Sequence, residues 1–197
     1  MENENNKNDD YTIDAYMYNR NWWLSHITRH IYPFWKKEFI AGPSTDSFNP
    51  FASWTLSEVV QHNMGLKDNT LCLQLVICDI PIGFCCVLLL DEFDKSDRMS
   101  PFSHEMYQDS AVLYNFVLDK PFRGGGYGTK LLQATIQYLI SNYQNKYKYL
   151  TLYVNTNNKG AIKLYEKHKF THMGPNPNQT NEAIYKSTLF DHIDKIT

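Results

Sequence analysis

Four glycines lie close together directly before a stretch that is patterned as a helix: Gly124, Gly125, Gly126 and Gly128. The first backbone N–H groups of a helix have no partner within it, and the helix dipole adds positive potential there, so anions bind at this end. Glycine lets phosphate oxygens approach such N–H groups, and Arg123 adds positive charge. The loop Arg123–Gly128 therefore predicts a pyrophosphate site.

Two other phosphate-binding motifs do not fit this loop. A nucleotide P-loop places lysine directly after its last glycine, whereas Thr129 separates Gly128 from Lys130. A GxGxxG motif that began at Gly124 would need glycine in place of Thr129, and the acidic residue expected about 20 positions later is not evident. A flexible turn is the alternative without a ligand, but four glycines between a strong strand and a helix cost backbone entropy and indicate a local role.

The elements that must position this loop follow from hydrophobic periodicity. Alternating or continuously apolar runs predict strands at Tyr11–Tyr18, Leu71–Cys78, Ile82–Leu90, Ala111–Leu118, Tyr149–Val154, Phe170–Met173 and Ala183–Leu189. Helix patterns lie at Asn21–Phe39, Ser57–His62, Gly128–Asn142 and Ala161–Lys169. We expect the apolar face of the third helix to pack on the sheet, which gives a mixed α/β sandwich.

Turn-forming residues separate these elements. Asp79–Pro81 predicts a hairpin turn between two apolar strands, and Pro175 with Pro177 predicts a loop near the end of the chain. The polar stretch Asp91–Asp109 predicts a long loop with room for functional contacts.

Composition limits the number of domains and the classes of partner. With 197 residues, 43% of them hydrophobic, the chain can bury one core but not two. We expect a disordered polar arm over residues 1–10 and a single domain over residues 11–197. The formal charge of −2 gives no field suited to nucleic acid.

No apolar run reaches the roughly 20 residues that cross a bilayer, because Gly83 and Asp91 interrupt or end the longest run. The N-terminus has neither a basic start nor an apolar segment, so we expect no membrane partner and a cytoplasmic location, with the nucleus as the alternative. All four cysteines fall in apolar runs, and no two of them form a CxxC pair. This predicts buried free thiols and no metal site. The cysteines are Cys72, Cys78, Cys85 and Cys86.

Two segments resemble the GNAT superfamily of N-acetyltransferases. Arg123, Gly126 and Gly128 fit its RxxGxG signature in a strand-turn-helix setting, and LYVNTNNKGAIKLYEKHKF resembles its second conserved segment. The resemblance covers Leu71–Leu189 in element order, while Met1–Asn69 matches only as a strand followed by helices. It implies a mixed, mostly antiparallel sheet flanked by helices, with a splayed central strand pair.

The resemblance also implies residue roles around acetyl-CoA. In this superfamily the strand before the loop carries a bulge, and its exposed amides hold the pantetheine arm and the thioester carbonyl. Here those amides belong to Phe116, Val117 and Leu118. The pyrophosphate would lie on the loop residues Arg123, Gly124, Gly125, Gly126, Tyr127, Gly128 and Thr129.

Asn158 matches an asparagine that bonds the coenzyme arm, although a helix N-cap explains it equally well. Tyr165 occupies the position of a tyrosine near the coenzyme sulfur, which makes it the predicted catalytic residue.

The resemblance leaves the general base open. Relatives that acetylate protein N-termini place tyrosine or glutamate where this chain has Val112, and some place histidine where it has Tyr153, so neither position matches. The candidates are water or the side chains of Tyr114, Tyr153, Glu105 and His104.

Direct transfer of an acetyl group from acetyl-CoA to an amine is the implied function. The resemblance of TNNKGAIKLYE to protein N-terminal acetyltransferases favours a protein N-terminus or a lysine as acceptor. The alternative acceptor is a small amine such as a polyamine or an amino sugar. The alternative function is a non-catalytic acyl-CoA-binding module. A monomer and a homodimer both fit the sequence.

Overall fold

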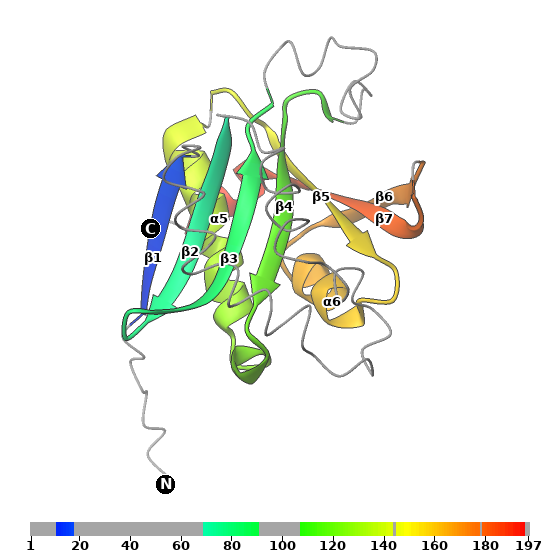
Figure 1. Ribbon diagram of the computed structural model, residues 1–197. Helices are drawn as coiled ribbons and strands as arrows, with labels where there is room; N and C mark the ends of the chain where they lie inside the picture. The colour runs from blue at the N-terminus through cyan, green and yellow to red at the C-terminus, as the bar shows by residue number, and fades with distance from the viewer. Residues whose placement is uncertain (1–10, 18–68, 91–106, 144, 178, 196–197) are drawn as a thin grey trace, which may run out of the picture.

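The computed structural model describes residues 11–17, 69–90, 107–143, 145–177 and 179–195. Seven strands form one sheet in the order β1-β2-β3-β4-β5-β7-β6 (Figure 1). The strands are β1 (Tyr11–Met17), β2 (Thr70–Ile77), β3 (Ile80–Leu88), β4 (Ser110–Leu118), β5 (Tyr149–Asn155), β6 (Thr171–Asn176) and β7 (Gln179–Thr188). Only β4 and β5 pair in parallel, so the predicted mixed, mostly antiparallel sheet is confirmed.

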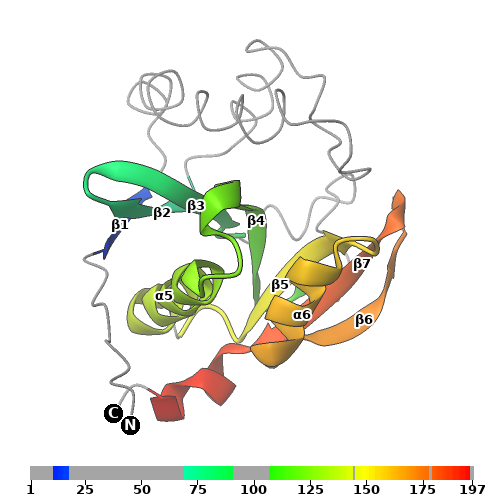
Figure 2. The ribbon, with the colours of Figure 1, turned by 90° about the horizontal axis from the view of Figure 1, so that it is seen from below.

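The two described α-helices cover the same face of the sheet (Figure 2), which we call the helix face. They are α5 (Tyr127–Tyr143) and α6 (Lys159–Lys167), and 3₁₀ turns follow β4 and β7 at η4 (Lys120–Phe122) and η5 (Leu189–Lys195). The buried positions of α5 are the ones that the apolar spacing predicts: Leu131, Leu132, Thr135, Ile136, Leu139 and Ile140. None of the described helices has the length and apolar character needed to cross a membrane.

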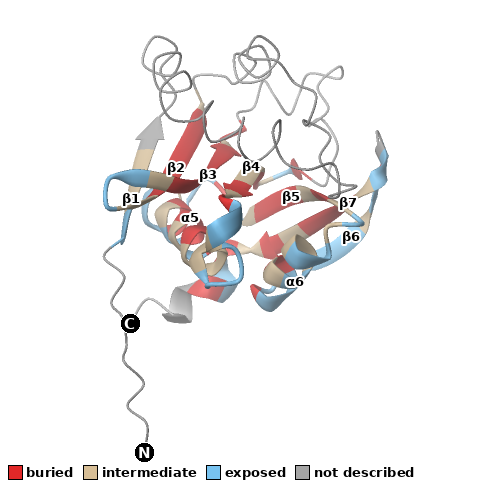
Figure 3. Ribbon diagram, turned by 60° about the horizontal axis from the view of Figure 1, so that its bottom comes forward, coloured by how far each residue is buried: buried red, intermediate tan, exposed pale blue. Residues whose placement is uncertain are grey.

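The central strands are buried on both faces (Figure 3). On the helix face, alternate side chains of β2 to β5 pack against α5. On the opposite face, Leu90, Tyr107 and Val112 form a second buried cluster, against which Tyr153 packs.

The β2–β3 turn is tighter than the predicted Asp79–Pro81 turn. Cys78 and Asp79 have φ angles of 49° and 60°, so two left-handed residues close the hairpin. Ile80 and Pro81 already belong to β3. The predicted burial of all four cysteines is therefore wrong at Cys78, which is exposed in this turn.

Other element bounds differ slightly from the prediction. Strand β6 runs through Pro175 to Asn176, because it is the edge of the sheet and an edge strand tolerates a missing N–H. Helix α6 ends at Lys167, since Lys169 has a φ of 62° and cannot continue it. The predicted arm, the predicted helices within residues 18–68 and most of the predicted 91–109 loop lie outside the described residues.

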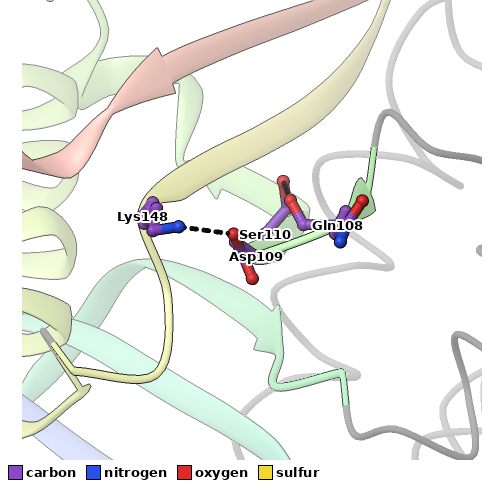
Figure 4. Close-up of polar contacts among 4 residues, drawn as sticks. All are labelled: Gln108, Asp109, Ser110 and Lys148. Atoms are coloured by element: carbon purple, nitrogen blue, oxygen red, sulfur yellow. Dashed lines mark hydrogen bonds and ion pairs between the residues drawn. The ribbon is translucent and has the colours of Figure 1, made fainter.

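The parallel strands β4 and β5 are tied together where they start (Figure 4). The backbone N–H groups of Lys148 and Tyr149 donate to the Asp109 carbonyl at 2.8 and 3.1 Å. Lys148 Nζ donates to Asp109 Oδ2 at 2.9 Å, and the Thr151 hydroxyl donates to Ser110 Oγ at 3.1 Å. The Lys148–Asp109 ion pair is exposed to water and therefore contributes little to stability. The backbone hydrogen bonds and the buried Thr151–Ser110 hydroxyl pair hold the starts of β4 and β5 together.

Gly83 provides the close contact between β3 and the end of β4. A Cβ atom there would lie 2.8 Å from Leu118 Cδ1 and 3.0 Å from the Val117 carbonyl oxygen. We predict that Gly83→Ala lowers the free energy of unfolding by about 1–3 kcal/mol, measured by urea denaturation. Gly160→Ala is the control, because its nearest neighbour is 3.9 Å away and it should lose no stability. Equal stability of the two variants would contradict the close contact.

Candidate functional site

Strands β4 and β5 separate beyond their first paired residues. The pairing covers only Ser110–Leu113 of β4 and Tyr149–Leu152 of β5, although both strands continue further. Figure 1 shows the two strands diverging from this point. We call the part beyond Leu113 and Leu152 the open end of the β4–β5 pair.

A bulge in β4 accompanies this separation. Cys86 and Phe84 of β3 pair with Tyr114 and Val117, so two residues of β4 stand opposite the single residue between them on β3. One of the two, Asn115, has a φ of 53°. Because a bulge bends its strand and ends regular pairing, it accounts for the expected splay.

The glycine loop leads directly into α5. Gly124 and Gly126 have φ angles of 80° and 84°, which only glycine adopts without strain. The Lys130 N–H donates to the Gly126 carbonyl at 3.1 Å, which is the first i→i−4 hydrogen bond of the helix. The N–H groups before Lys130 have no acceptor within the helix and so point toward a potential anion. The first turn of α5 carries no acidic residue to oppose an anion.

The Arg123 side chain contacts the end of β4. Its Nε donates to the Leu118 carbonyl at 2.9 Å, although the residue remains exposed. The arginine therefore joins the loop to the strand that the resemblance assigns to the coenzyme arm. The sequence pattern predicts its charge but not this bracing contact.

The start of α5, helix α6 and the bulge of β4 meet around Gly128. A Cβ atom at Gly128 would lie 3.5 Å from Leu164 Cδ2 and 4.0 Å from Phe116 Cε1. The Phe116 ring stands edge-on to Tyr165, with ring centroids 6.2 Å apart. The structure thus brings the predicted loop, strand and catalytic residues to one place.

Asn158 and Tyr165 lie on α6, the helix beside this place. The Asn158 side chain is the N-cap, because its Oδ1 accepts from the Ala161 N–H at 3.1 Å. Tyr165 is buried, and its ring also packs on Phe170 at 5.7 Å. Burial, with a smaller contribution from Cys85, raises the pKa of Tyr165 well above its usual value, so its hydroxyl stays protonated.

Two base candidates, Tyr114 and Tyr153, lie on the opposite face, one on each strand. Each follows the last paired residue of its strand, Leu113 or Leu152, so the two stand on either side of the open end. Burial, with a smaller effect of Cys86, raises the pKa of Tyr114. Burial and then the charge of Glu182 raise the pKa of Tyr153 to about 12.

Both tyrosines therefore stay protonated at neutral pH, which makes them poor general bases. The other two candidates, His104 and Glu105, lie outside the described residues.

The bulge also holds a polar side chain, Asn115, that no sequence motif indicates. The Nδ2 atom of Asn115 is buried and has no hydrogen-bond partner, so a buried donor lies at the open end. Its left-handed φ is visible only in the structure, although asparagine tolerates that conformation. Among the described residues, no three histidine, cysteine or acidic side chains gather as metal ligands.

Solved N-acetyltransferase structures share this arrangement. A spermidine N-acetyltransferase chimera from Vibrio cholerae and hSSAT gives a TM-score of 0.62 at 11% identity, covering 92% of this chain and 98% of that chain. The ribosomal-protein-S18-alanine N-acetyltransferase from Escherichia coli gives 0.56 at 18% identity, covering 91% and 94%. The likeness shows that the chain has the GNAT fold.

Sequence comparison identifies the family. Residues 28–170 match the Acetyltransferase (GNAT) family, so the chain belongs to this family of acyltransferases, which use acetyl-CoA. A probable spermine N(1)-acetyltransferase from Bacillus subtilis subsp. natto is 32% identical over 93 residues, covering 47% of this chain and 54% of the relative. The chain thus spans about half the length of the curated relatives it matches.

The N-cap role of Asn158 can be tested apart from any ligand. We predict that Asn158→Ala lowers the free energy of unfolding by about 1 kcal/mol, because one N–H group of α6 loses its acceptor. Asn158→Asp should retain near wild-type stability, since aspartate caps equally well. Chemical denaturation measures both, and a fully stable alanine variant would show that the cap contributes nothing.

Proposed function

We propose that this chain is an acetyl-CoA-dependent N-acetyltransferase whose acceptor is a polyamine. The observation that carries the proposal is the convergence of the β4 bulge, the glycine loop before α5 and Tyr165 on α6. The loop supplies N–H groups and Arg123 for the pyrophosphate, and the amides of Phe116, Val117 and Leu118 lie on the strand that has left β5.

In the proposed reaction a neutral amine of the acceptor attacks the thioester carbonyl carbon. The C–N bond forms, the C–S bond breaks, the attacking nitrogen loses one proton to water and the departing thiolate takes one proton. Cys85, opposite the bulge, is a poor acyl carrier, because burial raises the pKa of its thiol to about 12. This supports direct attack on the thioester.

The choice of acceptor rests on the relatives. The Bacillus relative at 32% identity is a probable spermine N(1)-acetyltransferase, and a chimera with the same fold is a spermidine N-acetyltransferase. The E. coli protein of the same fold acts on ribosomal-protein-S18 alanine. A peptide α-amine or a lysine is therefore the second acceptor class to test.

The deciding experiment measures release of CoA thiol from acetyl-CoA with spermidine, an N-terminal peptide, a lysine peptide and an amino sugar. Steady release with spermidine, together with acetylated spermidine by mass spectrometry, supports the proposal. Release with a peptide alone would replace the acceptor class. Acetyl-CoA binding without release in any arm would indicate a non-catalytic binding module.

Gly126→Ala should weaken acetyl-CoA binding by at least tenfold, because a φ of 84° is strained for alanine and the loop must rearrange. Gly128→Asp should abolish binding, since it adds a carboxylate at the predicted phosphate path. Calorimetry with acetyl-CoA measures both, and circular dichroism confirms the fold. Near-normal affinity in both variants would remove the phosphate role of the loop.

Tyr165→Phe should lower the turnover number by about tenfold to a thousandfold while acetyl-CoA affinity stays within a fewfold. With ordinary pKa values near 10 for tyrosine and 8.5 for a thiol, full proton transfer to the thiolate is already uphill. The raised pKa of Tyr165 makes it more so, and the hydroxyl acts as a hydrogen-bond donor to the sulfur. Single-turnover kinetics measures the rate of the chemical step. If Tyr165→Phe keeps the wild-type rate, Tyr165 has a packing role only.

A further inference from the structure

A carboxylate lies on β7, one strand away from the open end, on the face opposite α5 and α6. Glu182 of β7 pairs with Asn155 of β5, while Tyr153 pairs with Ile184. Ala183 and Tyr185 pack in the helix-face core, so the alternate residue Glu182 belongs to the opposite face, where Tyr153 packs. Glu182 and Tyr153 are thus diagonal neighbours on one face, within reach of a long side chain.

The Glu182 carboxylate is held in place from one side. Asn176, a buried residue at the end of β6, donates from Nδ2 to Glu182 Oε2 at 2.8 Å. Glu182 itself is only half-buried. The bond orients the carboxylate without neutralising it, because an amide donor carries no charge.

The charge of Glu182 has no cation bonded to it among the described residues. The nearest lysine along β7, Lys186, instead places its Nζ 4.1 Å from the centre of the Tyr149 ring, at the tied end of the β4–β5 pair. Burial, and then the charge of Glu182, raises the pKa of Tyr153. A half-buried carboxylate oriented by a neutral donor is suited to a cationic ligand.

We infer that Glu182, oriented by Asn176 beside Tyr153, binds an ammonium group of the acceptor that is not the one acetylated. The inference rests on the proposed function. A carboxylate favours the protonated form of a bound amine, whereas attack on a thioester needs a neutral nitrogen. Holding a second ammonium avoids this conflict, and a polyamine supplies both groups in one chain.

The test measures spermidine binding to the full chain by calorimetry, which requires no turnover. Glu182→Gln should weaken spermidine binding by about tenfold to a hundredfold, because the ammonium loses its charged acceptor. Its acetyl-CoA affinity should equal that of wild type. Glu182→Asp should restore part of the spermidine affinity, and added salt should weaken wild-type binding more than binding to Glu182→Gln.

Glu166→Gln is the matched control. Glu166 lies on α6 and accepts a hydrogen bond from the Tyr185 hydroxyl at 3.3 Å on the helix face, so its loss should leave spermidine affinity unchanged. Failure of wild type to bind spermidine, equal affinity of Glu182→Gln, or an equal loss in Glu166→Gln would overturn the inference. Binding through Glu182 without thiol release would instead overturn the proposed function alone.

Discussion

The extra residue in β4 is the constraint on which the site depends. Backbone bonds from Lys148 and Tyr149 to Asp109 hold β4 and β5 together at their start, so the two strands cannot separate there. The bulge at Asn115 then bends β4 away from β5. Because one end is fixed and the other diverges, the opening has a defined position in the sheet. If β4 paired with β5 along its whole length, the backbone of Phe116, Val117 and Leu118 would be hydrogen-bonded to strands on both sides, which would leave no amide for a ligand.

The two faces of the sheet differ in electrostatic character where β4 and β5 part. On the helix face the start of α5 and Arg123 favour an anion, and Tyr165 supplies a protonated hydroxyl. On the opposite face, Tyr114, Tyr153 and Glu182 lie near the place where the strands part. The proposed anionic donor and cationic acceptor would therefore approach from opposite sides and meet where the strands part. Such an arrangement promotes reaction mainly by positioning.

Local patterns predicted the parts of this site that are local in sequence. The glycine loop, the apolar spacing of α5 and the N-cap at Asn158 each depend on neighbouring residues, so the sequence carried enough information. The hairpin turn was misplaced because its two left-handed residues, Cys78 and Asp79, lack the glycine that usually marks such a turn. Glu182 was missed because only the β5–β7 register places it beside Tyr153.

Burial of the tyrosines has a consequence for how the amine is activated. Tyr114 and Tyr153 both hold their protons at neutral pH, so neither can remove a proton from an ammonium group. An alkyl amine with a pKa near that of lysine, about 10.4, is neutral in fewer than roughly one molecule in a thousand at pH 7. In a polyamine, however, a neighbouring ammonium lowers the pKa of the next amine by like-charge repulsion. A carboxylate that binds one ammonium, as we propose for Glu182, would therefore act by placing the other amine near the open end, and the ion pair would offset part of this pKa lowering.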